Sequence, residues 1–190
     1  MISEKMGHTL DKPFASLARR IPFSPNAITI SGFLFTVICS LIVAYDLRWG
    51  ALCMLPAALL DMVDGMVARA QGKSSKYGAF LDSVLDRYSD AAILLAVAWN
   101  LGTKGDVTGV ILSCSSLVGS LIISYVRARA EGLGISCTHG LMERPERLIL
   151  LFLGAVSGYM TAALWVLSVL THVTVAQRIF HTRKHLLSQA

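Results

Sequence analysis

"LLDMVDGMVARAQGKSSKYGAFLDSVLDRYSDA", residues 59–91, places five carboxylates in an otherwise apolar part of the chain. They are Asp61, Asp64, Asp82, Asp86 and Asp90. Spacings of i, i+3 and i, i+4 put them on one face of each of two helices. The connection "RAQGKSSKYG" (69–78) is short enough to make those helices antiparallel neighbours. We therefore expect four or five carboxylates to meet at one end of a helical hairpin.

The rest of the composition predicts a membrane protein. Of the 190 residues, 54% are hydrophobic and only 15% are charged, and the mean hydropathy is +0.61. Apolar runs of about 20 residues can cross a bilayer as helices. Six such segments are expected, at about Ala27–Leu47, Trp49–Ala70, Gly78–Leu101, Val107–Ala128, Pro145–Tyr159 and Thr161–Phe180. The predicted fold is an all-α integral membrane protein with one domain, residues 1–190, whose six-helix bundle covers residues 25–182.

Residues 1–24 precede the first apolar segment and show no cleavable signal peptide. Apolar residues recur there at three- or four-residue steps, which predicts an amphipathic helix lying on the membrane surface. These residues are Ile2, Met6, Leu10, Phe14 and Leu17. A flexible tail is the alternative.

The basic residues predict the orientation. With six spans, 14 of the 17 Lys and Arg residues fall on the side that holds both termini; the exceptions are Arg48, Arg87 and Lys104. Basic loops stay in the cytoplasm. We expect a multi-pass protein of the cell membrane, with both termini and the carboxylate cluster on the cytoplasmic side.

A cluster of ionised carboxylates requires either protons or a cation. An all-oxygen ligand set suits a hard divalent ion such as Mg²⁺, Mn²⁺ or Ca²⁺. The four cysteines (Cys39, Cys53, Cys114 and Cys137) show no paired spacing and are interpreted as small apolar residues. Three functions remain open from the residues alone: a metal-dependent transferase, a cation or proton transporter, and a membrane protein with a structural metal. Clustering near one face, without an evident inverted repeat, disfavours the transporter.

The spacing of Asp61-x-x-Asp64-Gly65-x-x-Ala68-Arg69, eight residues, then Gly78-x-x-x-Asp82-x-x-x-Asp86 resembles the signature of the CDP-alcohol phosphotransferase family. The resemblance implies that Asp61, Asp64, Asp82 and Asp86 bind one or two Mg²⁺ or Mn²⁺ ions. It also implies that Asp86 is the general base. Asp90 stands outside the signature and is expected to complete the charge cluster, pair with Arg87 or face another helix.

The resemblance also implies a CDP-lipid donor. Its contacts come from the signature, from "SPNAIT" (24–29) at the first span, and from the loop of the hairpin. The expected residues are Pro25, Asn26, Ala27, Ile28, Thr29, Asp61, Gly65, Ala68, Arg69, Ser75, Gly78 and Asp82.

The acceptor is predicted from a second basic region. "SYVRARAE" (124–131) and "GLMERPERL" (140–148) resemble the branch of the family that makes phosphatidylinositol phosphate or archaetidylinositol phosphate from myo-inositol 1-phosphate. Arginine binds phosphate oxygens in a planar fork, which a neutral alcohol would not need. The implied phosphate-binding residues are Arg127, Arg129, Arg144 and Arg178. Alternatively, each arginine serves only to keep its loop on the cytoplasmic side of the membrane.

Other acceptors in the same family stay open: glycerol 3-phosphate, serine, or CDP-inositol with inositol phosphate. The expected partners are the CDP-lipid, the inositol phosphate, membrane lipids and, from the resemblance, a second copy of the chain as a homodimer. No nucleic-acid partner is expected.

Overall fold

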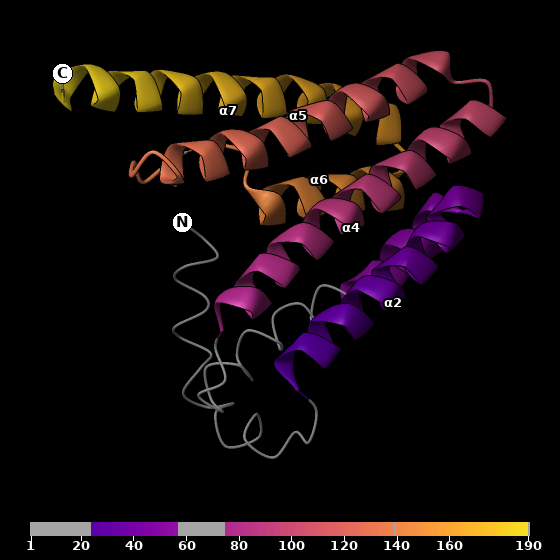
Figure 1. Ribbon diagram of the computed structural model, residues 1–190. Coiled ribbons are helices and arrows are strands. Elements are labelled where there is room, and N and C mark those ends of the chain that lie inside the picture. Colours follow the sequence, from indigo (N-terminus) through magenta and orange to yellow (C-terminus); the bar gives the residue numbers. More distant parts are fainter. Residues whose placement is uncertain (1–23, 57–74, 139, 190) are drawn as a thin grey trace. The chain divides into compact units, whose positions relative to one another are not determined.

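The computed structural model describes residues 24–56, 75–138 and 140–189, and all regular structure in these ranges is α-helical. Its helices are α2 (Pro25–Tyr45), α4 (Lys76–Thr103), α5 (Val107–Glu131), α6 (Arg144–Ser157) and α7 (Met160–Gln189), shown in Figure 1. Residues 47–56 are also helical. The chain divides into two compact units, with the boundary inside α4 between Ile93 and Leu94.

In the first unit, α2 and the helical residues 47–56 meet at a tight turn. Ser24 caps the start of α2, and Pro25 occupies its first turn. Asp46 ends α2, and its Oδ1 accepts hydrogen bonds from the backbone N–H groups of Arg48 (2.8 Å) and Trp49 (3.0 Å). The carboxylate therefore caps the next helix, close to the predicted boundary between the first two spans.

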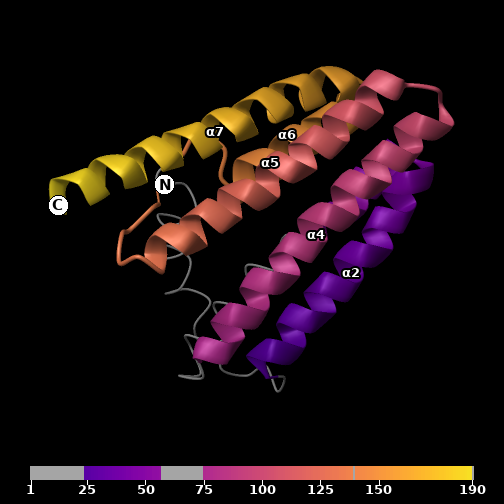
Figure 2. The ribbon, with the colours of Figure 1, turned by 45° about the horizontal axis from the view of Figure 1, so that its top comes forward.

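The first part of α4 runs beside α2 in both views of the ribbon (Figures 1 and 2). The rings of Phe33 on α2 and Tyr88 on α4 pack edge to face, with centroids 6.4 Å apart. Such aromatic pairs add about 0.5–1.5 kcal/mol beyond the area they bury. This packing fixes the helix that carries Asp82 and Asp86.

In the second unit, α5 and α7 lie side by side and run in the same direction. Near their N-terminal ends, the Thr161 hydroxyl donates to Asp106 Oδ2 (2.5 Å), and the Asp106 Oδ1 accepts from the Gly109 N–H (2.8 Å). These two bonds hold the pKa of Asp106 below its usual value. Asp106 thus caps α5 and ties it to the start of α7.

Small and polar residues line the contact between α5 and α7. Ser115 Oγ lies 2.8 Å from Ser168 Oγ, and a Cβ at Gly119 would lie 2.8 Å from the Cβ of Thr171. Small residues of this kind let membrane helices approach closely, and their hydroxyls bond across the contact. Both helices are thereby held at a short, fixed separation.

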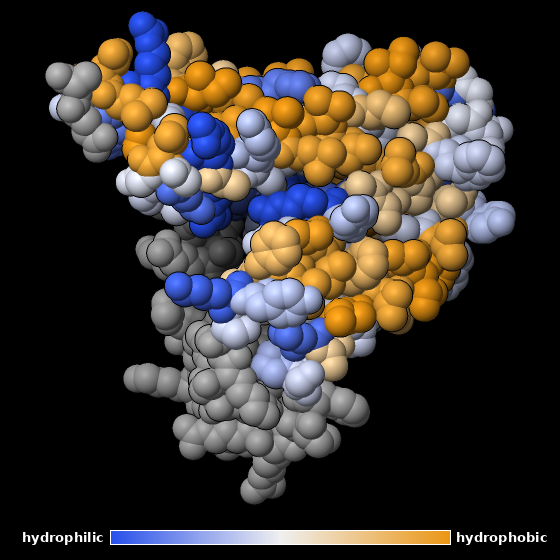
Figure 3. All heavy atoms as spheres, in the orientation of Figure 1, coloured by the Kyte–Doolittle hydropathy of each residue, from blue (hydrophilic) through white to orange (hydrophobic). Residues whose placement is uncertain are grey.

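Three described helical segments are long and apolar enough to cross a membrane: α2, α5 and Met160–Ser188 of α7. Large apolar side chains such as Trp99 and Trp165 are 66% and 55% exposed. Figure 3 shows broad apolar areas on the outer surface, while hydrophilic side chains stand out around the C-terminal part of α7. Exposed apolar surface of this extent suits contact with lipid.

The predicted segments agree with α2, α4, α5, α6 and α7 to within a few residues, except at the end of α7. That helix continues to Gln189, well past the predicted end at Phe180. Helix α6 has 14 residues, or about 21 Å, against about 30 Å of hydrocarbon. The N-terminal arm and most of the second segment lie outside the described residues, so the count of six spans stays a prediction.

Candidate functional site

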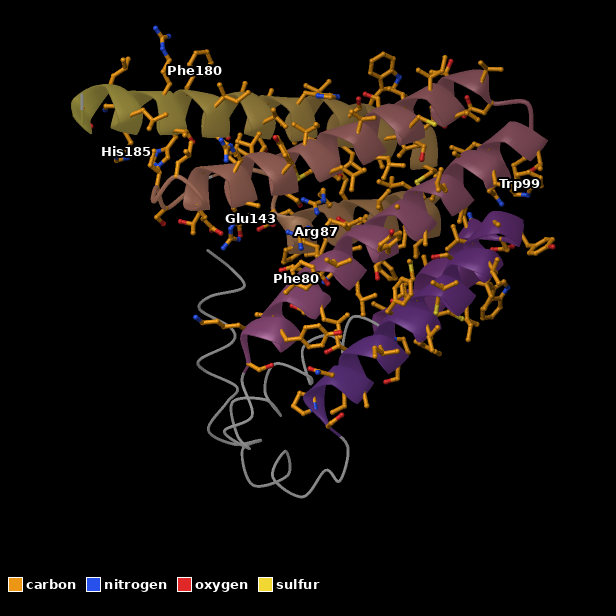
Figure 4. All side chains as sticks on the ribbon, viewed as in Figure 1. Phe80, Arg87, Trp99, Glu143, Phe180 and His185 are labelled. Carbon is orange, nitrogen blue, oxygen red and sulfur yellow. The ribbon has the colours of Figure 1, made fainter. Side chains whose placement is uncertain are left out.

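Two of the predicted metal ligands lie on the described part of α4. Asp82 and Asp86 are one helical turn apart and half-buried. Arg87 Nη1 lies 3.9 Å from Asp86 Oδ2 and donates to the Ser83 carbonyl oxygen (2.5 Å); Figure 4 shows Arg87 on this helix. The Asp86–Arg87 contact is long for an ion pair and partly exposed, so it contributes little to stability.

Five residues of the predicted signature, Asp61, Asp64, Gly65, Ala68 and Arg69, lie outside the described residues. Within the described ranges, no three His, Cys, Asp or Glu side chains stand close enough together to hold a metal ion. The four-aspartate metal site therefore stays a prediction. The two described ligands fit it chemically, because both offer carboxylate oxygens from one helix face to a hard divalent ion.

Three residues predicted to bind the donor lie close together in the first unit. The Gly78 N–H donates to Ser75 Oγ (2.9 Å). A Cβ at Gly78 would lie 3.0 Å from Asn26 Oδ1 and 3.1 Å from Ser75 Oγ. Glycine thus allows the start of α4 to approach α2, and it brings the Asn26 amide and the Ser75 hydroxyl to one place.

The other α2 residues that were predicted to bind the CDP-lipid make local hydrogen bonds or are buried. The Thr29 hydroxyl donates to the Pro25 carbonyl (3.1 Å), and the Ala27 N–H donates to the Ser24 side chain (3.3 Å). Ile28 is buried. Asn26 is therefore the residue of this segment whose side chain stands next to Gly78 at the start of α4.

Arginines gather in the second unit around the cytoplasmic end predicted for α7. Arg178 is only 3% exposed and donates to the Ile123 carbonyl on α5 (2.9 Å). It interacts electrostatically with Glu143 and with two like charges, Arg127 and Arg147. Figure 4 shows Glu143 where α6 begins. We call Arg127, Arg147 and Arg178 the arginine cluster.

Arg147 was not among the predicted site residues. It is 6% exposed, and its Nη1 donates to the Met142 carbonyl (3.3 Å). Its spacing from Arg144, one helical turn earlier in "RPER", is the signal that could have placed it in the site. A buried arginine carries a large desolvation penalty, which a bound anion would reduce.

The remaining predicted acceptor arginines are distributed as follows. Arg127 forms an exposed ion pair with Glu131 (2.8 Å) on the same helix. Arg144 is half-buried at the start of α6. Arg129 is exposed and lines a separate groove between α5 and α7. Arg178 thus interacts electrostatically with Arg127 and with Arg147, whereas Arg129 lines the groove.

Comparison with known proteins identifies the same family as the signature. The model of the CDP-alcohol phosphatidyltransferase family matches residues 23–180. A phosphatidylinositol phosphate synthase of Mycobacteroides abscessus is 36% identical, over 96% of this chain and 88% of its own length. An archaetidylinositol phosphate synthase of Methanothermobacter thermautotrophicus is 38% identical, over 90% of this chain and 88% of its own length.

Solved structures of the Mycobacterium tuberculosis phosphatidylinositol phosphate synthase resemble this fold. The structure with CDP-DAG bound has a TM-score of 0.83 at 32% identity, covering 92% of this chain and 94% of that one. The structure in complex with manganese and citrate has the same TM-score and identity, covering 91% of this chain and 88% of that one.

Proposed function

Because this chain belongs to the CDP-alcohol phosphatidyltransferase family and is a phosphotransferase of that family, we propose that it transfers a phosphatidyl or archaetidyl group from a CDP-lipid to myo-inositol 1-phosphate. CMP is the other product. The observation that carries this proposal is the arginine cluster of α5, α6 and α7, in which Arg147 and Arg178 are buried. Relatives named as inositol phospholipid phosphate synthases, similar over nearly the whole chain, support the same acceptor.

The acceptor side rests on charge. Arg178 and Arg147 are buried, and Arg178 interacts electrostatically with Arg127, Arg147 and the carboxylate of Glu143. Buried positive charge favours an anionic ligand, and the guanidinium fork matches phosphate oxygens. We assign binding of the acceptor phosphate to Arg127, Arg144 and Arg178, and we add Arg147 to them. Arg129 was also predicted from the sequence, but it contributes only if its exposed side chain turns away from the groove.

The donor side rests on the aspartates and on α2. Asp61, Asp64, Asp82 and Asp86 would hold one or two Mg²⁺ or Mn²⁺ ions, which would neutralise the charge that develops on the diphosphate. The manganese-bound relative supports this choice of metal. Asn26, Ser75 and Gly78 would contact the nucleotide, together with the other predicted residues of the signature and of α2. Arg87 stands beside Asp86 and limits where a ligand can approach it.

The reaction is a single displacement at phosphorus. An inositol hydroxyl oxygen attacks the lipid-side phosphorus of the donor, and the bond from that phosphorus to the CMP oxygen breaks. Asp86 accepts the proton of the attacking hydroxyl, a role that suits a partly exposed carboxylate. The arginines hold the acceptor through its phosphate, so that its hydroxyl is oriented for attack.

The membrane arrangement is part of the proposal. The chain would form one domain of six spans (25–182) with an interfacial N-terminal arm (1–24), and it would place both termini and the site in the cytoplasm. The one-sided distribution of basic residues supports this orientation. A homodimer is proposed from the family resemblance.

The test is an assay of CMP release by the purified protein. CDP-diacylglycerol and CDP-archaeol are each offered with Mg²⁺ or Mn²⁺ and with a panel of acceptors: myo-inositol 1-phosphate, glycerol 3-phosphate and serine. We expect release with the inositol phosphate. CMP release only with another acceptor would refute the assigned acceptor but would still agree with the family. Cation flux into liposomes without CMP release would favour a transporter.

A further inference from the structure

A groove of about 400 Å³ lies between the C-terminal parts of α5 and α7, apart from the arginine cluster. Such a volume falls within the range of roughly 300–1,000 Å³ that is usual for sites of small ligands. Apolar side chains, among them Leu133, Ile179 and Leu187, provide most of its lining. Arg129 from α5 and Arg183 from α7 line it as well.

The groove lies at the level where the membrane is expected to end. A helix rises about 1.5 Å per residue, so about 20 residues cross the hydrocarbon. Counted from Met160, α7 reaches that length at Ile179. After Phe180 the helix continues with polar or basic residues, including Arg183, and the exposed Leu187 follows. The groove therefore extends from the hydrocarbon boundary into the headgroup layer.

The surface of the groove is almost wholly apolar, which suits an apolar segment of a ligand. Arg129 on one wall and Arg183 on the other line it with the apolar parts of their side chains, and none of the described residues that line it is acidic. The acid closest in sequence to Arg129 is Glu131, which pairs with Arg127 at 2.8 Å. An occupant that combines an apolar tail with a phosphate would match both the lining and the two arginines.

We propose that this groove binds one anionic phospholipid of the surrounding membrane, separate from the CDP-lipid donor. One acyl chain lies along Leu133, Ile179 and Leu187, and the headgroup phosphate lies between Arg129 and Arg183. A second copy of the chain is a poorer occupant, because a two-fold contact through this groove would bring like charges together. The bound lipid fixes the C-terminal part of α7 beside α5.

Native mass spectrometry of the full-length protein in a neutral detergent tests the proposal. Phosphatidylglycerol, phosphatidylcholine and glycerol 3-phosphate are the probes. We expect one tightly held phosphatidylglycerol per chain, weaker phosphatidylcholine and no retained glycerol 3-phosphate. Arg183→Gln removes a charge-assisted bond to the phosphate, so the Kd for phosphatidylglycerol should rise about tenfold.

Lys184→Gln is the matched control, because it removes one positive charge from the next position of α7 without altering the lining of the groove. Its Kd should stay within about twofold, since exposed charges at a distance are screened. Equal losses in both variants would overturn the proposal. So would displacement of the bound lipid by saturating CDP-diacylglycerol, which would assign it to the donor site.

A second variant, Leu187→Trp, fills the groove at an exposed position where folding tolerates the change. It should abolish retention of phosphatidylglycerol and leave the mass of the protein assembly unchanged. Loss of a dimer in this variant, with lipid retention intact, would overturn the proposal in favour of a second copy.

Discussion

Replacing Arg178 by glutamine should separate activity from stability. The wild-type guanidinium is 3% exposed, bonded to the Ile123 carbonyl, and close to the like charges of Arg127 and Arg147. Glutamine is shorter and neutral, so the variant loses the proposed contact with an acceptor phosphate. It also loses the repulsion from Arg127 and Arg147 together with the attraction to Glu143, and these two changes oppose each other in stability.

The expected size of the loss follows from the burial of Arg178. A hydrogen bond to a charged group contributes about 1.5–3 kcal/mol, and deep burial removes most solvent screening. If this contact is made to the acceptor in the transition state, kcat/KM for myo-inositol 1-phosphate should fall roughly 10- to 150-fold. The Tm in detergent should change little, because the lost repulsion from Arg127 and Arg147 offsets the lost attraction to Glu143.

Steady-state CMP release and thermal unfolding, measured on the same preparation, provide the test. Lys184→Gln removes the same charge from an exposed position further along α7 and should leave both quantities unchanged. A Tm that falls together with activity would indicate that Arg178 only stabilises the fold. A folded variant whose kcat/KM stays within about twofold of wild type would refute the assignment to the acceptor.

Three further substitutions test other parts of the structure. Asp86→Asn should lower kcat at least roughly 100-fold while circular dichroism stays unchanged, because the general base is lost; a large fall in Tm would favour a structural metal instead. Thr161→Val should destabilise the protein by about 0.5–1.5 kcal/mol through loss of its bond to Asp106. Since that bond lowers the folded pKa of Asp106, its contribution is present above the unfolded pKa of about 3.9 and disappears as the pH falls through the folded pKa. Chemical unfolding at pH 7 and below pH 4 should therefore show a smaller difference between wild type and variant at the lower pH; an equal difference would contradict the pairing. Gly154→Ala would place a Cβ 2.6 Å from the Cβ of Ala163, and the overpacking should cost about 1–3 kcal/mol in thermal unfolding, whereas an unchanged Tm would show that α6 can move away from α7.

Much of the helical arrangement could be predicted because apolar length determines where a helix can cross a membrane. The start of α5 at Val107 agrees with the prediction, since Asp106 is a strong cap. The sixth apolar segment was predicted to end at Phe180, because the residues that follow it, "HTRKHLLSQ", are mostly polar. The structure shows that the helix continues, and its Arg183 and Leu187 line the groove beside α5.

The candidate site was only partly predictable. The spacing of Asp82 and Asp86 was sufficient to predict that they share one face of a helix, because helical periodicity relates sequence position to face. Convergence of Arg147 with Arg178 depends on how α6 packs beside α7, which local sequence does not encode. The placement of Arg129 beside the groove likewise depends on the rotation of α5 about its axis. The family resemblance supplied roles for these arginines but not their orientations.

The most direct test of the central claim is the acceptor preference of the wild-type protein. It compares kcat/KM for myo-inositol 1-phosphate with kcat/KM for free myo-inositol, under saturating CDP-lipid and Mg²⁺ or Mn²⁺. Arginines that hold a phosphate leave an unfilled, charged pocket when the phosphate is missing, so we predict a preference of roughly 10⁴-fold or more for the phosphorylated acceptor. Equal rates with the two acceptors would contradict the assignment of the arginine cluster to an acceptor phosphate.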